Sequence, residues 1–459
     1  MKKLFFVIFL GSFLIFLVSS CDKDKDSVEK FSTASVEENK TVVEDAGIDF
    51  VQVMDRMRPL KTIDAVANLA DIMSSSDSKG IGFFRDSKLF SAIKTATYTA
   101  KGDKKVNDVF DAMISCKGDD PESIKQFWDE NVGTYTWNPS LNDWDIVLGG
   151  NKFIFYFPSS DVATTNDAIF TISNYTGVNI ANPVDDDYTG DLPATVNADL
   201  KVGSSTLITF VFGAEYNTDG VPNKIAADLD IEGFKFEIDI ANTTKFVSAS
   251  YTFLEGANVI MKLTASGEGL FTEDNYNDNT TTHSETNYYY DYVYNPYTQM
   301  WEEVLVPYTD TWEETDFEEI LNSAAADFQL FNIAIRGNID VKNLVDQIKL
   351  IDKDWDNELI NENTAKERYV EKINQYLNLR LVNVSKNEII AKVEAYVVHE
   401  TNYNYEDIYI DFRLTFSDGS PIDVETYFDN GFNSFVNELN GLINDLNSEY
   451  ELDLDPVEY

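Results

Sequence analysis

The stretch Val247-Ser248-Ala249-Ser250-Tyr251-Thr252-Phe253 decides the fold of this chain. Apolar side chains alternate along it with hydroxyl-bearing ones, which is typical of a strand with one buried face and one solvated face. A turn sequence, Glu255-Gly256-Ala257-Asn258, follows, and the alternation resumes at Val259, Met261 and Leu263. The sequence therefore predicts two antiparallel strands of a half-buried sheet.

The same alternation continues in both directions and defines a predicted antiparallel β region over residues 135–314. Further alternating runs in this region are Phe153, Phe155, Phe157 and Ile208, Phe210, Phe212. The phase of the alternation slips at Glu232-Gly233, between Ile231 and Phe234. We therefore expect a bulge or a tight bend there, which keeps the apolar residues of both halves on one core.

Helical spacing appears on both sides of the β region. Within residues 46–134, Ile63, Val66, Ala70 and Met73 recur at helical intervals and predict a helical region. Residues 315–459 mix strands with helices and form a predicted α+β C-terminal region. The predicted fold class is α+β, with a helical N-terminal region followed by an antiparallel β-sheet that has one face covered by helices.

The first residues of the chain have the parts of a secretory signal. Met1-Lys2-Lys3 is basic, residues 4–18 are almost all apolar, and Val18-Ser19-Ser20-Cys21 places small residues before a cysteine. The apolar run is shorter than the ~20 residues that span a bilayer. We predict that residues 1–20 are a lipoprotein signal peptide, and that the polar residues 21–45 form a flexible acidic tether.

Val18-Ser19-Ser20-Cys21 resembles the lipobox of bacterial lipoproteins, where the cysteine is acylated. The run Asp22-Lys23-Asp24-Lys25-Asp26 after it resembles the export signal of Bacteroidetes-type surface lipoproteins of uncharacterised function. The resemblance implies a lipid anchor with palmitate-type chains on Cys21 and a place in the outer membrane, exposed at the cell surface. It covers only the N-terminal segment and implies no activity.

The chain is strongly acidic, with 80 Asp and Glu residues against 35 Lys and Arg residues and a formal net charge of −45. This charge repels nucleic acid and anionic lipid headgroups at long range, so we expect no nucleic-acid partner. We expect most of the carboxylates to form a solvated surface that keeps the protein soluble.

Residues that often carry catalysis or bind zinc are scarce. The chain has two histidines, His283 in a polar segment expected to be a loop and His399 at a strand end. Lipidation would consume Cys21 and leave Cys116 as the free thiol, so we predict no disulfide. A Cys116–His399 pair and a zinc site lack any supporting motif. We predict a non-enzymatic protein without a cofactor.

Asp352, Asp354 and Asp356 have the spacing of a calcium-binding loop between two predicted helices. The segment departs from that pattern, because Asn357 stands where the sharp turn needs glycine and Asn363 where the bidentate glutamate belongs. We interpret it as a solvated acidic connector and keep calcium as the alternative.

An aromatic hairpin is predicted over residues 287–306. Its two strands flank Asn295-Pro296-Tyr297-Thr298, which suits a type I turn. If Asn295 pairs with Thr298, one face of the hairpin carries a row of aromatic side chains, namely Tyr288, Tyr290, Tyr292, Tyr294 and Trp301. Such a row either binds a ligand or packs on the outer face of the sheet, and both interpretations remain open.

These observations favour a non-catalytic cell-envelope lipoprotein that binds a partner protein or a glycan at the cell surface through the aromatic hairpin. One alternative is a carrier of an amphipathic ligand in a cavity between sheet and helices. Another is a hydrolase that uses carboxylates, although no pair can be singled out among 80 acidic residues.

Overall fold

The computed structural model describes residues 30–75, 124–181, 190–295, 300–402, 405–429, 431–450 and 455–457. The predicted signal peptide, Cys21 and Cys116 lie outside these residues. Within the described part of the chain, none of the helices combines the length and the apolar character needed to cross a bilayer.

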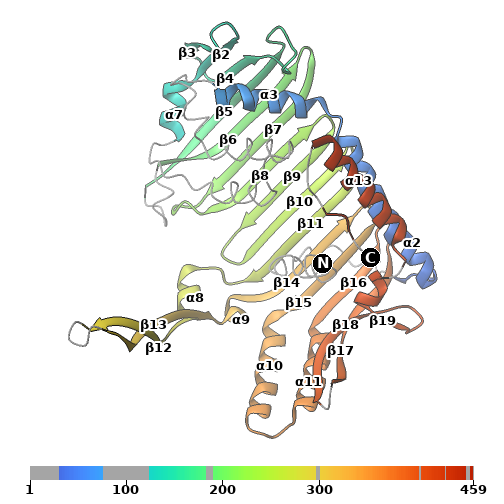
Figure 1. The fold of residues 1–459 in the computed structure, drawn as a ribbon. Helices are drawn as coiled ribbons and strands as arrows, with labels where there is room; N and C mark the ends of the chain where they lie inside the picture. The colour runs from blue at the N-terminus through green and yellow to red at the C-terminus, as the bar shows by residue number, and fades with distance from the viewer. Residues whose placement is uncertain are drawn as a thin grey trace.

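The structure contains helices and strands along its whole described length (Figure 1). The helices are α2 (Val36–Met57), α3 (Lys61–Ser75), α7 (Ile124–Asn131), α8 (Glu273–Asp278), α9 (Phe317–Ile320), α10 (Val341–Asp356), α11 (Glu362–Tyr376), α12 (Val424–Asp429) and α13 (Asn433–Tyr450). The strands are β1 (Lys30–Phe31), β2 (Gly133–Asn138), β3 (Asp143–Leu148), β4 (Phe153–Phe157), β5 (Ala168–Ile180), β6 (Gly190–Val202), β7 (Ser205–Tyr216), β8 (Pro222–Ile231), β9 (Phe234–Asn242), β10 (Phe246–Glu255), β11 (Asn258–Gly269), β12 (Thr280–Asn295), β13 (Met300–Thr315), β14 (Leu321–Leu330), β15 (Ile333–Asp340), β16 (Leu377–Asn383), β17 (Glu388–Asn402), β18 (Tyr405–Thr415) and β19 (Pro421–Asp423).

One large sheet holds 17 strands, and β12 with β13 forms a second sheet. From β4 to β19, each strand of the large sheet pairs antiparallel with the next strand of that sheet along the chain. The pairs β2–β4 and β1–β17 are parallel. The large sheet is therefore mainly an up-and-down meander built from local hairpins (Figure 1). The chain thus has a mixed helix and strand fold dominated by an antiparallel sheet.

The alternating stretch that opened the sequence analysis forms β10, and its predicted partner forms β11. Tyr251 pairs with Leu263 and Phe253 pairs with Met261, as two antiparallel strands require. The predicted slip at Glu232-Gly233 is a tight bend between β8 and β9, where both residues have positive φ angles of 50° and 95°. This geometry suits a two-residue hairpin turn, so both predictions are confirmed.

Helices α2 and α3 cover one face of the large sheet. Ala65 and Leu69 of α3 belong to a buried cluster with aromatic residues of β2 to β4, including Phe155. Val53 of α2 belongs to a second cluster with Phe253 of β10. Each Å² of apolar surface removed from water contributes about 25 cal/mol to stability. These buried contacts are therefore the main stabilising term of the fold.

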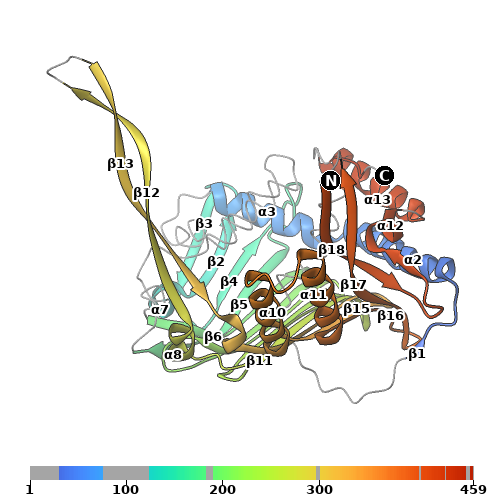
Figure 2. The same cartoon turned by 90° about the horizontal axis from the view of Figure 1, so that it is seen from below.

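Helix α13 packs on α2, and α2 in turn contacts β14 and β15, so α2 lies between the sheet and α13 (Figure 2). The Glu44 carboxylate of α2 accepts hydrogen bonds from the backbone N–H groups of Ser434 and Phe435, at 2.8 and 3.2 Å. A carboxylate at a helix N-terminus satisfies unpaired N–H groups and complements the helix dipole. The C-terminal helix is thereby anchored to the N-terminal one.

Residues 30–45 of the expected flexible tether are folded in the structure, and residues 21–29 lie outside the described residues. Residues 30–31 form β1, and α2 begins at Val36. Ser35 and Glu38 form a capping box, in which the Ser35 hydroxyl accepts from the Glu38 N–H and the Glu38 carboxylate accepts from the Ser35 N–H. The prediction of a tether is wrong for residues 30–45, because this segment begins an amphipathic helix. Glu37 and Glu38 face solvent, while Asn39 and Lys40 are buried.

The predicted boundary between residues 135–314 and 315–459 does not separate two sheets. β11 pairs with β14, with Gly269 opposite Leu321, so both regions share the large sheet. Everything between these two strands, from α8 to α9, is an excursion from one hairpin of the meander.

Candidate binding site: the aromatic arm

The excursion between β11 and β14 is a long two-stranded arm. We use "arm" for β12 and β13, which pair with each other in one uninterrupted register from Thr280–Thr315 to Asn295–Met300. At about 3.4 Å per residue, its 16-residue strands extend for roughly 50 Å. Figure 2 shows the arm projecting away from the large sheet. The arm is therefore exposed on both faces for most of its length.

The tyrosine row lies on one face of the arm. Tyr288 pairs with Pro307, Tyr290 with Leu305, and Tyr292 with Glu303. Directly opposed residues point to the same face of an antiparallel pair. The Tyr288, Tyr290 and Tyr292 side chains are 60%, 67% and 61% exposed. They do not pack on the outer face of the large sheet, which was the alternative interpretation.

The tip of the arm is described less fully. The predicted turn at residues 295–298 falls mostly within residues 296–299, which lie outside the described residues. Asn295 pairs with Met300 instead of Thr298, a shift of two residues that leaves every residue on its predicted face. Tyr294 is therefore opposite Trp301 in the backbone register, on the face of the tyrosine row. The side chains of these two residues lie outside the described part of the structure.

The opposite face of the arm is also aromatic. The His283 ring stacks on Trp312 with centroids 5.5 Å apart, and its Nε2 lies 3.0 Å from a Glu314 carboxylate oxygen. Tyr289 meets Tyr308 edge to face at 5.9 Å. The prediction that His283 lies in a polar loop is wrong, because its threonine-rich surroundings form the root half of β12.

The arm carries negative charge and contains neither lysine nor arginine. Its carboxylates are Glu285, Asp291, Glu302, Glu303, Asp310, Glu313 and Glu314. The Tyr292 hydroxyl donates to Glu303 at 3.1 Å, and the Asn287 amide donates to Asp310 at 3.0 Å. Aromatic rings and carboxylates are thus interleaved along both faces of the arm.

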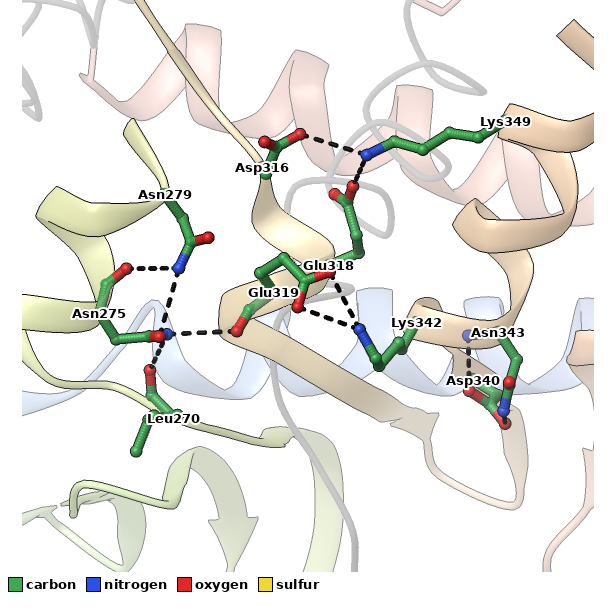
Figure 3. Close-up of polar contacts among 10 residues, drawn as sticks. All are labelled: Leu270, Asn275, Asn279, Asp316, Glu318, Glu319, Asp340, Lys342, Asn343 and Lys349. Atoms are coloured by element: carbon green, nitrogen blue, oxygen red, sulfur yellow. Dashed lines mark hydrogen bonds and ion pairs between the residues drawn. The ribbon is translucent and has the colours of Figure 1, made fainter. Parts of the chain in front are cut away.

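Hydrogen bonds hold the root of the arm, shown in Figure 3. The Asn275 side chain in α8 donates to the carbonyl groups of Leu270 and Glu319, at 2.9 and 3.2 Å. The backbone N–H of Asp316 donates to the Asn279 carbonyl at 2.9 Å. These contacts join the segment that leaves the sheet to the segment that returns to it, so the arm starts from an ordered base.

Two lysines of α10 hold the returning segment (Figure 3). Lys342 Nζ lies 3.1 Å from both carboxylate oxygens of Glu319. Lys349 donates to Glu318, which is buried, and lies 3.3 Å from Asp316. The hydrogen bond that Lys349 donates to Glu318, followed by the one it donates to Asp316, raises the pKa of Lys349. Both lysines therefore stay charged and fix α9 against α10.

The predicted calcium ligands are not brought together. Asp352, Asp354 and Asp356 lie in the last turns of α10 and not on a connecting loop. The Tyr369 hydroxyl donates to Asp352, and Arg368 donates to Asp354 at 2.9 Å. Asp352 and Asp356 are one turn apart on one face of the helix, and Asp354 points away from both. Across the described residues, no three potential ligands among His, Cys, Asp and Glu gather into a group suited to a metal ion.

His399 lies in β17 and pairs with Ile408, far along the chain from the arm. Cys116, whose pairing with His399 no sequence motif supports, lies outside the described residues. A separate hollow of about 370 Å³ lies over β5 and β6. Its lining is polar, formed by Asn151, Lys152, Thr171, Ser173, Asn174, Asp199 and Lys201. This hollow does not offer the apolar walls that an amphipathic ligand would need.

The arm, its aromatic faces and its fixed root could not be assigned from any relative, since the chain matches no protein-family model, no curated protein and no solved structure.

Proposed function

We propose that this protein is a non-catalytic, lipid-anchored protein of the outer membrane that binds a partner protein or a glycan through the arm. The observation that carries the proposal is the exposure of Tyr288, Tyr290 and Tyr292 on a ribbon that stands outside the large sheet. Isolated two-stranded ribbons gain little stability from their own surface. A ribbon of this length with unburied rings on both faces therefore suits contact with another molecule.

Tyrosine supports this role because it combines a large apolar surface with a hydroxyl and has few rotatable bonds to immobilise. The hydrogen-bonded root adds a second argument, since it presents these rings from a fixed base. A preordered site loses less conformational entropy on binding.

The test of the binding role is a triple variant, Tyr288→Ala, Tyr290→Ala and Tyr292→Ala. The whole chain and the variant are compared on a glycan array and against surface proteins cross-linked to the wild type. We expect binding to fall by about 2 kcal/mol or more, because clustered interface aromatics dominate binding energy. The melting temperature should change little, since these rings are exposed.

The matched control replaces three exposed apolar residues away from the arm, with Leu141→Ala, Val162→Ala and Leu359→Ala. This control should bind like the wild type. Equal binding by the arm variant and the wild type would refute the arm as the binding element.

The location is tested separately. The proposal rests on the lipobox-like sequence at Cys21 and the acidic run after it. Cys21→Ser should leave unprocessed precursor and abolish membrane association, because the acyl chains provide the anchoring energy. Protease treatment of intact cells should release the wild-type protein if it faces outward. Membrane association that survives Cys21→Ser would contradict the lipid anchor.

A further inference from the structure

The arm has two open strand edges. Among the described residues, β12 pairs with β13 alone and β13 with β12 alone. Each strand therefore directs alternate backbone N–H and C=O groups away from its partner, toward solvent. Natural proteins usually protect such edges with lysine, proline, a bulge or a short strand.

The outer edge of β12 lacks all of these protections. It has no lysine and no proline, its register with β13 contains no shift, and it is 16 residues long. The β13 edge is different because it contains Pro307. A proline is tolerated in a paired strand where its nitrogen faces away from the neighbour, so Pro307 removes a donor from the outer edge of β13. The β12 edge is the one suited to accept another strand.

Charge decides which strand can add there. A second copy of this chain would bring another arm with the same carboxylates, and like charges on adjacent strands destabilise the pair. The chain as a whole carries a net charge of −45. At a distance this charge repels a second copy of the chain and attracts a cationic partner. Self-association through the arm is therefore disfavoured.

The side chains of β12 suit lysine and arginine on both faces of an added strand. On one face, the added side chains would lie beside Tyr288, Tyr290 and Tyr292, whose rings attract cations. On the other face they would lie beside Glu285 and Asp291, both exposed. Neighbouring strands are about 4.8 Å apart, so long basic side chains reach either group.

We propose that the partner of the arm is an extended, lysine- or arginine-rich polypeptide segment that adds as a third strand along β12. This inference rests on the binding role proposed above and names the chemistry of the partner. A glycan could stack on the tyrosines, but it has no strand-like backbone to occupy the open edge. The open edge and the absence of basic residues therefore favour a cationic strand.

The probe is a dodecapeptide of alternating lysine and threonine, which has the period of a strand. Its binding to the whole purified chain is measured by calorimetry and compared with two peptides. One has the same charges but carries N-methyl groups on alternate residues, which removes edge hydrogen bonds. The other replaces lysine with glutamate. We expect the methylated peptide to bind about tenfold more weakly or worse, and the acidic peptide not to bind.

The matched protein variants have equal net charge. The arm variant carries Glu285→Gln, Asp291→Asn, Glu303→Gln and Asp310→Asn, and the control carries Asp161→Asn, Glu215→Gln, Asp219→Asn and Glu400→Gln, at exposed positions outside the arm. The arm variant should bind the lysine peptide about tenfold more weakly, while the control should stay within about twofold of wild type.

Each other outcome overturns the inference. Equal affinity for the methylated peptide would show that the edge is not used, and equal losses in the two variants would show attraction by net charge alone. Tyrosine-dependent binding of a glycan without binding of the peptide would retain the binding role but refute the cationic strand. An arm-dependent dimer in sedimentation would make a second copy the occupant. Failure of both the arm test above and the peptide test would refute both proposals.

Discussion

Lys349 of α10 donates a hydrogen bond to the buried carboxylate of Glu318, at the point where the arm returns to the sheet. Glu318 is 6% exposed, so water has little access to its carboxylate and Lys349 supplies a polar partner in its place. The contact ties the arm to the helical hairpin of α10 and α11. The root of the arm is thereby fixed to a helix that also packs on β14, the strand into which the arm returns.

Replacing this lysine should destabilise the protein. Lys349→Met leaves a buried carboxylate without its partner, and we expect a loss of about 1–2 kcal/mol in urea unfolding, because unpaired buried groups retain their desolvation cost. Lys353→Met, at an exposed position of the same helix, is the control and should cost less than about 0.5 kcal/mol. Adding Glu318→Leu to Lys349→Met should recover part of the loss. Similar losses in the two lysine variants would contradict the assigned role.

Gly269 should be irreplaceable at the root of the arm. A Cβ built on Gly269 would overlap the carbonyl oxygen of Ile320, where β11 and β14 close together. We expect Gly269→Ala to cost about 2–4 kcal/mol in unfolding, since backbone must move to admit the methyl group. Gly213→Ala in β7 is the control, because a Cβ there meets no atom within 4 Å. A stable Gly269→Ala protein would mean that the root is looser than its hydrogen bonds indicate.

Two buried tyrosines should make the fold sensitive to alkali. Burial raises the pKa of Tyr135 to about 12, and burial also raises the pKa of Tyr427. The unfolded chain loses these protons near pH 10, so the folded state holds more protons above that value. The contribution of these tyrosines to the free energy of unfolding is fully present below pH 10 and is lost as the pH rises toward 12. Tyr135→Phe should reduce this slope by up to about 1.4 kcal/mol per pH unit.

Tyr427→Phe provides the comparison at neutral pH. The Tyr135 hydroxyl donates to the Asn131 carbonyl at 2.5 Å, while the Tyr427 hydroxyl has no hydrogen-bond partner among the described residues. Tyr135→Phe should therefore cost about 1 kcal/mol at pH 7, and Tyr427→Phe should be neutral or stabilising. Urea unfolding at pH 7 and at pH 11 measures both effects. An unchanged slope in both variants would contradict the alkaline prediction.

Chelators should leave the fold unchanged. Asp352 and Asp354 are engaged by Tyr369 and Arg368, and the helix places Asp354 apart from its neighbours. We expect EDTA to change the free energy of unfolding by less than about 1 kcal/mol, whereas removing a structural metal usually lowers it by several kcal/mol. A larger shift that Asp354→Asn abolishes would reinstate the calcium alternative.

The sequence allowed the sheet to be predicted wherever local alternation decided the structure. Tyr251 and Phe253 face the same core as Phe236 because strands that follow one another along the chain also pair in space. In a meander each strand pairs with the next strand along the chain, so the turns alone determine which strands pair. The start of α2 was missed although Ser35 and Glu38 carry a capping box, because the surrounding polar composition suggested a solvated tether.

The arm was predicted in part. Alternation gave the strand and the shared face of Tyr288, Tyr290 and Tyr292, but it could not show that the hairpin leaves the large sheet. That departure depends on the pairing of Gly269 with Leu321, which closes the sheet beneath it. The stacking of His283 on Trp312 was also beyond prediction, because it depends on the exact register of residues about 30 positions apart.

The closure of β11 on β14 makes the arm a replaceable module. The N–H of Leu270 donates to the Ile320 carbonyl at 2.8 Å, so the chain on either side of the excursion is already joined without it. Under the binding role proposed for the arm, substitution, lengthening or exchange of residues 280–315 would change the partner and leave the scaffold strands paired as they are. The proposed binding residues and the residues that pair the scaffold strands are therefore encoded in separate stretches of this sequence, and each stretch can be altered without rebuilding the other.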